Sequence, residues 1–271
     1  MNRKYNWSLA LAAALLLAAT GCGNSSNSGS SSESESGSAS APAATAGKTV
    51  DPTTAGEVTG MVTLDGAPPK MKAINMSQEA ACASQHSTPA LSEEVVTGDK
   101  GALANVIVYV TSGAEDYSFP TPSDPVEIDQ KGCQYHPHIL GLMAAQTLSV
   151  VNDDPTTHNI HPVPKDNREW NESQPPGSAP ITQSFARPEV PIPVKCNVHP
   201  WMKAYIGVFA NPYFQVTGKD GAFDLKNLPP GTYTIVAWQE LYGASDPQTV
   251  TIGPKETKTV NFVFKATAAG D

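Results

Sequence analysis

Short runs of β-forming residues, separated by Gly and Pro, make up the chain from Gly56 onward. One run, Val106-Ile107-Val108-Tyr109-Val110, consists of β-branched and aromatic residues, which are enriched in strands. Turn residues such as Asp65-Gly66 lie at the ends of the runs, as they do between the strands of a sheet. No long segment after the N-terminus has the apolar period of a helix. The sequence therefore predicts an all-β fold.

The expected strands follow one another at short intervals. Two segments, 71–101 and 165–180, have no strand pattern and are expected to be irregular or loops. Pro191 and Pro193 lie within one expected strand, and proline cannot donate a hydrogen bond to a sheet. That strand should therefore lie at an edge or contain a bulge. We expect strands over residues 58–64, 103–110, 126–130, 138–143, 147–151, 181–185, 191–195, 204–209, 248–252 and 257–264, and one strand that carries Tyr233, Ile235 and Ala237 on a single face.

A short loop at residues 196–202 concentrates metal-binding side chains. Cys196, His199 and Met202 place a thiol, an imidazole and a thioether three residues apart, so one turn can close on one metal ion. Soft sulfur ligands with imidazole select copper, and two His, one Cys and a weak axial Met form a blue-copper electron-transfer centre. The second His must come from a distant segment, and His158 offers it. His161 competes, but alternation puts it on the opposite face of an extended strand.

This loop resembles the ligand loop of the cupredoxins, most closely that of amicyanin, which has the same Cys-x2-His-x2-Met spacing and a Pro after the His. Amicyanin also has a His-Asn-Val-His segment, where this chain has His158-Asn159-Ile160-His161. The resemblance implies a Greek-key β-sandwich with one type-1 copper. It places His158, Cys196 and His199 in the ligand plane, Met202 in the axial position, and Asn159 as the side chain that braces the loop. The alternative for Cys196 is a buried small apolar residue, the commonest fate of a free Cys.

A second motif lies after the loop. Residues 220–225 and 228–238, with the turn at Pro229-Pro230-Gly231, look like the carboxypeptidase regulatory-like β-sandwich, which has a carbohydrate-binding-like fold. The usual opening strand of that sandwich, Gly-x-Val-x-Gly-x-Val, has its counterpart far upstream at 56–64. We therefore expect a nested order, in which 56–118 and 213–266 form this sandwich and 119–212 form an inserted cupredoxin domain, followed by a tail at 267–271. Two domains in tandem are the alternative.

The N-terminus resembles a bacterial lipoprotein signal. A positive start is followed by a short apolar run and the small-residue site Ala19-Thr20-Gly21-Cys22, although Ala19 stands where the family has Leu. Residues 1–21 would be removed, Cys22 would carry lipid, and 22–55, rich in Ser, Gly and Ala, would be a disordered tether. An ordinary secretory signal is the alternative. Both imply export, and the lipid would anchor the protein at the periplasmic face of a membrane or at the cell surface.

Export permits disulfides, and two cysteines have no other expected task. Cys22 takes lipid and Cys196 takes metal, so we expect Cys82 and Cys133 to pair. The alternative is two free thiols or additional metal ligands. His136 and His138 follow Cys133 and could form a second metal site, but a structural or solvent-facing role is the simpler interpretation.

Charge and missing motifs exclude several functions. Without the signal the chain has 15 Lys+Arg (17 minus Arg3 and Lys4) against 26 Asp+Glu, a net charge of −11, which argues against binding nucleic acid. No Gly-x-Ser-x-Gly, phosphate loop or His-Glu-x-x-His occurs, so we do not expect an enzyme.

We expect an exported electron carrier whose redox partner docks near Pro200 and Trp201, beside a His199 at the solvent edge. The alternatives are a non-redox cell-envelope or carbohydrate-binding module, and a copper storage or delivery protein.

Overall fold

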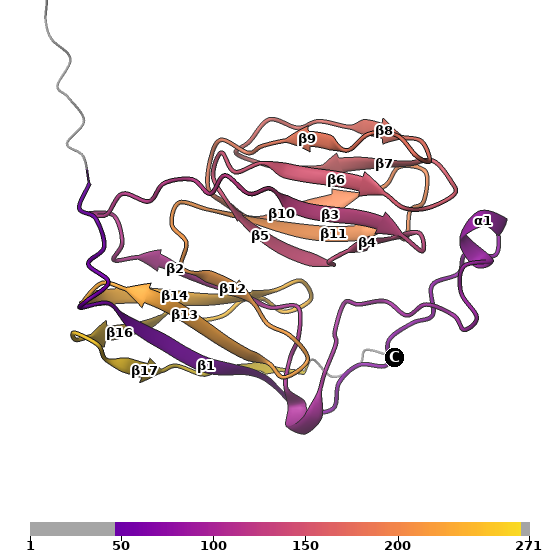
Figure 1. Ribbon diagram of the computed structural model, residues 1–271. Helices are drawn as coiled ribbons and strands as arrows, with labels where there is room; N and C mark the ends of the chain where they lie inside the picture. Colours follow the sequence, from indigo (N-terminus) through magenta and orange to yellow (C-terminus); the bar gives the residue numbers. More distant parts are fainter. Residues whose placement is uncertain (1–46, 267–271) are drawn as a thin grey trace, which may run out of the picture. The chain divides into compact units, whose positions relative to one another are not determined.

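The first and last strands of the folded part of the chain lie side by side. The computed structural model describes residues 47–266. In it, strand β1 (Gly56–Asp65) runs parallel to β17 (Thr257–Thr259) and β18 (Phe262–Lys265) and antiparallel to β13 (Ala222–Leu228). This sheet faces a second one, in which β2 (Ile107–Ser112) and β14 (Gly231–Gln239) are central. The two sheets form the first sandwich (Figure 1). Its other strands are β12 (Phe214–Val216), β15 (Gly243–Ala244) and β16 (Gln248–Ile252).

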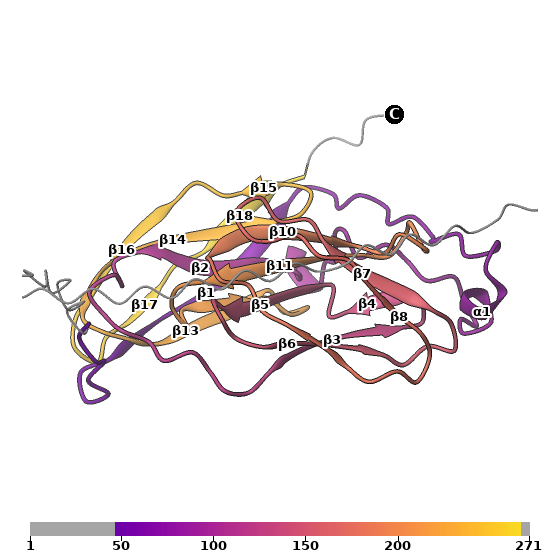
Figure 2. The same cartoon turned by 90° about the horizontal axis from the view of Figure 1, so that it is seen from above.

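The strands between β2 and β12 form two further sheets, the second sandwich. One has the order β5-β11-β10-β7-β8 and the other β4-β3-β6-β9. Apolar side chains from both sheets, among them Ile128, Leu142 and Ile206, form one buried cluster. The strands are β3 (Val126–Lys131), β4 (Gln134–His136), β5 (Ile139–Met143), β6 (Leu148–Asn152), β7 (His158–Pro162), β8 (Glu172–Gln174), β9 (Ile181–Gln183), β10 (Glu189–Lys195) and β11 (Lys203–Phe209) (Figures 1 and 2).

The all-β prediction is confirmed for residues 47–266. The described helices are one α-helix of four residues, α1 (Ala80–Ala83), and one short 3-10 turn, η1 (Asp99–Gly101). No helix within 47–266 is long and apolar enough to cross a membrane. The expected signal peptide, the lipidation site Cys22, most of the tether and the tail at 267–271 lie outside the described residues.

Aromatic side chains join the two sandwiches. A small buried cluster combines Ile107 and Trp238 of the first sandwich with Ile139 and Phe209 of the second. The ring of Phe209 stacks on that of Phe214, with centroids 4.2 Å apart. Because this cluster draws apolar surface from both sandwiches, it should stabilise them jointly.

A buried ionic contact accompanies these rings. His138, just before β5, pairs through Nε2 with Glu240 Oε1 at 2.8 Å, and the two side chains are 9% and 6% exposed. The other ring nitrogen of His138 lies 3.1 Å from the carbonyl oxygen of Lys203. His138 is thus engaged by protein groups on both sides, whereas His136 is exposed.

Strand β10 accommodates its two prolines by a bulge. It lies between β11 and β7 in the middle of its sheet, so of the two expected alternatives, an edge position or a bulge, the edge position does not apply. The expected bulge is present as a register shift between Glu189 and Ile192, next to Pro191. The sheet tolerates the prolines because β7 pairs with β10 only at Val194 and Lys195, beyond both of them. β10 therefore still delivers Cys196 at its end.

A long excursion separates β1 from β2. Its outer part, residues 74–90, which we call the cap, carries α1 and is closed at its base by backbone contacts between Ala73 and Leu91 and between Ile74 and Ala90. Within the cap only Met76 and Cys82 are buried. Both belong to the apolar cluster of the second sandwich. The cap thus arises next to a strand of the first sandwich and ends against the core of the second.

Candidate metal centre

Three predicted ligand side chains converge at one end of the second sandwich. His158 is the first residue of β7, and Cys196 and His199 lie in the loop between β10 and β11. One donor atom of each lies within 4.8 Å of the others, and all three residues are buried. The Nδ1 atoms of the two imidazoles are 2.8 Å apart, and Cys196 Sγ is 3.8 Å from His199 Nδ1. Segments 38 or more residues apart in sequence therefore meet at a single point.

The loop closes on itself through the backbone. The Met202 N–H donates to the His199 carbonyl at 2.9 Å, and the Cys196 N–H donates to the Met202 carbonyl at 3.3 Å. The His199 N–H points at Cys196 Sγ at 3.4 Å. The Met202 side chain is 1% exposed and packs in the same apolar cluster as Cys196. The spacing of three residues thus turns His199 and Met202 back toward the end of β10.

Asn159 ties this loop to β7. Its Oδ1 accepts from the Asn197 N–H at 2.7 Å and from the Val198 N–H at 3.3 Å, and it lies 3.3 Å from Cys196 Sγ. Its Nδ2 donates to Asn171 Oδ1 at 2.6 Å. Bonds of this kind fix the orientation of a ligand side chain. Asn159 occupies the place that a bracing side chain requires.

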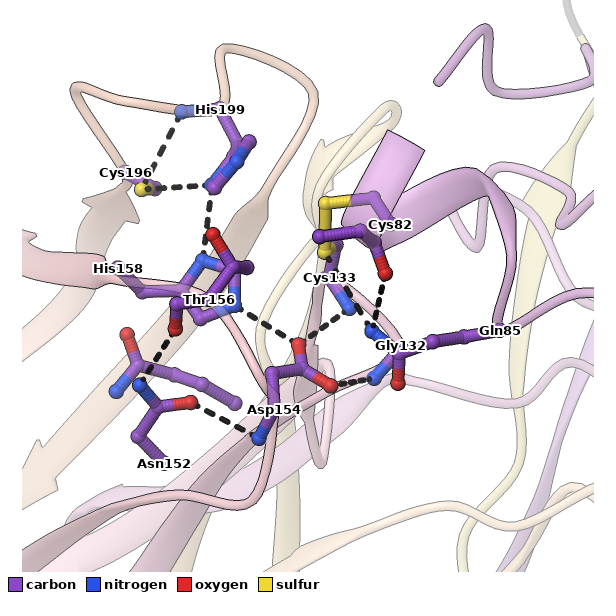
Figure 3. Close-up of polar contacts among 12 residues, drawn as sticks. Cys82, Gln85, Gly132, Cys133, Asn152, Asp154, Thr156, His158, Cys196 and His199 are labelled. Atoms are coloured by element: carbon purple, nitrogen blue, oxygen red, sulfur yellow. Dashed lines mark hydrogen bonds and ion pairs between the residues drawn. A yellow bond between two sulfur atoms is a disulfide. The ribbon is translucent and has the colours of Figure 1, made fainter. Parts of the chain in front are cut away.

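Asp154 is a member of the site that the sequence did not reveal. Its Oδ2 lies 2.8 Å from His158 Nε2 and accepts from the Cys133 N–H at 2.7 Å, while its Oδ1 accepts from the Gly132 N–H at 2.6 Å (Figure 3). Gly132 and Cys133 have positive φ in the two-residue turn between β3 and β4, which aims both amides at one carboxylate. The one signal in the sequence was the position of Asp154 four residues before His158.

The contact with Asp154 assigns the proton on His158. A carboxylate accepts, so Nε2 of His158 carries the hydrogen, and in the neutral ring Nδ1 is left with a lone pair toward His199 and Cys196. Nδ1 is the atom that a metal ion at this point would use.

The surroundings of Cys196 favour its thiolate. Burial alone would raise the pKa of the thiol, but the neighbouring His158 imidazole and contacts with loop amides lower it below its ordinary value. For His158, burial lowers the pKa, yet the hydrogen bond to Asp154 raises it overall. Burial lowers the pKa of His199, and the neighbouring His158 lowers it further. The site thus holds a sulfur biased toward the anion, the form that binds metals.

His199 does not reach the solvent edge as expected. It is 1% exposed, and its Nε2 is buried without a hydrogen-bond partner. A ring nitrogen of His199 lies within 4.8 Å of both Cys82 Sγ and Cys133 Sγ. The structure joins these two cysteines in a disulfide, so the predicted pairing is confirmed, and the disulfide-bearing cap covers the imidazole edge.

The remaining residues of interest surround this edge. Pro200 is exposed, and Trp201 is half-buried with its ring 5.1 Å from that of His199. The indole N–H of Trp201 donates to the Cys133 carbonyl at 3.0 Å. His161 faces away, with its ring nitrogens 3.1 Å from Asn197 Oδ1 and 2.6 Å from Glu169 Oε1. His158, rather than His161, therefore joins the cluster.

No family model and no curated protein matches the chain. Solved structures with a similar part include a copper-containing nitrite reductase from Thermus scotoductus, at 19% identity over 37% of this chain and a TM-score of 0.30. The alignment covers only 25% of that enzyme. A purple cupredoxin from Nitrosopumilus maritimus is 20% identical over 31% of this chain and 99% of its own, with a TM-score of 0.27. An oxidised amicyanin mutant is 19% identical over 31% of this chain and 82% of its own, also with a TM-score of 0.27.

Proposed function

We propose that this protein is an electron carrier with one type-1 copper ion held by His158, Cys196, His199 and Met202. The observation that carries the proposal is the convergence of the two Nδ1 atoms and the Cys196 sulfur in one buried cluster. Two imidazoles and a thiolate are a donor set that suits copper, and a weak axial thioether completes a blue-copper centre. Met202 is buried in the turn that the other two loop ligands share.

Copper would supply a one-electron couple. The chain's own residues would keep the ligands in one arrangement in both oxidation states. Asp154 holds the His158 ring, Asn159 holds the loop amides, and the backbone bonds of Met202 close the turn. Fixed ligands limit the rearrangement that accompanies electron gain and loss, which favours transfer over substrate chemistry.

The proposal also covers the cellular location of the protein and the kind of partner that it exchanges electrons with. We take the protein to be exported and lipid-anchored through Cys22, with the folded part held by the tether in the cell envelope. Its partner would be another redox protein. The Cys82–Cys133 disulfide supports an oxidising compartment, because such bonds persist mainly outside the cytosol.

The test is the colour of the copper-loaded protein. Wild type with one equivalent of Cu(II) should show an intense visible thiolate-to-copper band, and voltammetry should show a reversible one-electron couple. Cys196→Ser should lose the band, whereas Val198→Ala, at an exposed position in the same loop, should keep it. A colourless protein with one tightly bound copper would instead indicate storage or delivery. Failure to bind copper would refute both and leave the non-redox module.

A further inference from the structure

The edge of His199 is closed by a segment that the rest of the site does not need. The ligand cluster is built from β7 and the loop between β10 and β11, whereas the cover comes from the cap, residues 74–90. The cap reaches the site at Cys82, which bonds to Cys133 in the turn that also holds Asp154. Figure 3 shows the disulfide beside the ligand cluster, with α1 carrying Cys82.

Little besides the disulfide holds the cap in place. Its buried side chains are Met76 and Cys82, the half-buried Ile74 and Ala90 pack on the core of the second sandwich at the base of the cap, and most of the other cap residues are exposed. The polar contacts between the cap and the second sandwich are a 2.7 Å contact of His86 Nε2 with the Gly132 carbonyl and a weak 3.9 Å contact of Gln85 Nε2 with Cys133 Sγ. Segments with few buried contacts open locally at low free energy. The covalent bond is therefore the main attachment.

The buried Nε2 of His199, which has no hydrogen-bond partner, indicates what would happen if the cap opened. This atom loses hydrogen bonding to water when the cap is closed, and nothing in the described chain replaces that bond. Opening the cap would return the atom to water and expose the imidazole edge next to Trp201.

We propose that the cap is a lid on the metal centre and that the Cys82–Cys133 disulfide is its latch. With the disulfide formed, external reagents and redox partners are kept from the His199 edge. A dithiol that reduces the disulfide releases the lid and opens that edge. The part of the proposal that concerns electron exchange rests on the proposed function, whereas the lid and its latch do not.

The latch step is a thiol–disulfide exchange. A thiolate of the dithiol attacks one sulfur during a local opening, which breaks the Cys82–Cys133 bond and forms a mixed disulfide. The second thiol of the reductant closes its own disulfide and releases both protein cysteines. Two electrons and two protons pass from the dithiol to Cys82 and Cys133, and copper takes no part in the balance.

The experiment follows histidine modification in metal-free protein, so its outcome does not depend on copper binding. Wild type and the double variant Cys82→Ala, Cys133→Ala are treated with diethyl pyrocarbonate, and each modified histidine is followed by peptide mass spectrometry. His199 should react at least about tenfold faster in the variant, because the opened lid no longer covers it. His136, exposed in both, is the control for reagent. His158, fully buried and bonded to Asp154, is the control for intact folding.

Two results overturn the lid. An unchanged rate at His199 would mean that the cap stays closed without its disulfide. Equal increases at His199 and His158 would mean that the whole site, rather than a lid, has come apart. If the double variant does not fold, wild type is reduced with dithiothreitol, its freed cysteines are blocked with iodoacetamide, circular dichroism checks the fold, and the same comparison of the two histidines applies.

Discussion

Replacement of Asp154 by Asn tests how the candidate ligand His158 is held. The carboxylate serves three donors, the amides of Gly132 and Cys133 and the Nε2–H of His158, and its residue is only 3% exposed. Asn keeps one oxygen, which can accept from Gly132, but it puts an NH2 group where the other two donors converge. Hydrogen bonds to a charged group contribute about 1.5–3 kcal/mol each, so losing two of them should cost about 3–6 kcal/mol of unfolding free energy.

The same change should weaken copper binding. His158 can relieve the clash by moving its proton from Nε2 to Nδ1. Nε2 would then accept a hydrogen bond from the new NH2 group, but Nδ1 would lose the lone pair that the metal needs. Losing such a supporting carboxylate typically lowers metal affinity by about 10–100-fold. Urea unfolding of the metal-free protein and competition with a copper chelator measure the two effects.

Asp153→Asn is the matched control. Asp153 is the neighbouring residue, but its side chain is 55% exposed and forms a surface pair with Lys131. Surface pairs contribute at most about 1 kcal/mol, so this variant should unfold close to wild type and bind copper normally. The reasoning about Asp154 is refuted if the two variants have the same unfolding free energy and the same copper affinity.

Three further changes probe other parts of the molecule. Asn159→Ala removes the acceptor of the Asn197 amide and should cost about 1–3 kcal/mol in urea unfolding and shift the visible band, whereas an unshifted band would contradict the bracing role. Glu240→Gln should cost about 1–3 kcal/mol near pH 5.5 and less near pH 9. Burial lowers the pKa of His138, but the bond to Glu240 raises it overall, so the charged pair stabilises fully below the ordinary pKa of about 6.5 and is lost as pH rises through the raised folded value. A cost that is the same at both pH values would argue against a charged pair. Phe209→Ala should cost about 3–5 kcal/mol in thermal unfolding, and a loss under 1 kcal/mol would show that the cluster between the sandwiches contributes little.

The sequence predicted best what depends on local spacing. Cys196, His199 and Met202 lie in one turn, so their proximity could be foreseen without a fold. His158 was reached through the resemblance of its segment rather than through physics, since nothing local in the sequence places β7 beside the loop. The disulfide was predicted by elimination among four cysteines, and the structure joins the same pair.

The sequence predicted poorly what depends on tertiary pairing. Strand β8 lies in a segment that was expected to be a loop, because Glu172-Ser173-Gln174 is polar, and it is a strand only because it pairs with β7 at the edge of the sheet. Leu103 was expected to begin a strand, but β2 begins at Ile107, and the Leu103 amide instead donates to the Val62 carbonyl of β1. Propensity cannot anticipate such partners.

The sequence failed to predict the roles of Asp154 and of the cap for the same reason. Asp154 meets two amides from a hairpin 21 and 22 residues earlier, and the cap covers His199 because of one bond that spans 51 residues. Neither contact leaves a periodic pattern in the sequence. The expectation that His199 lies at the solvent edge failed because the disulfide brings residues 74–90 to the imidazole, a contact that the local sequence around His199 does not encode.

The side-by-side position of β1 and the last strands sets an order of events for folding. The Met61 amide, in β1, donates to Asn261 Oδ1 across a separation of 200 residues, so this sheet closes only when nearly all of the chain is present. The pairings of β3 to β11 are confined to residues 126–209 and close shorter loops. Closing a longer loop costs more chain entropy, and contacts between distant residues form slowly. The second sandwich should therefore assemble first during synthesis, while β1 is still without its partners. A chain truncated before β17 should leave β1 with an open edge that can associate with another chain.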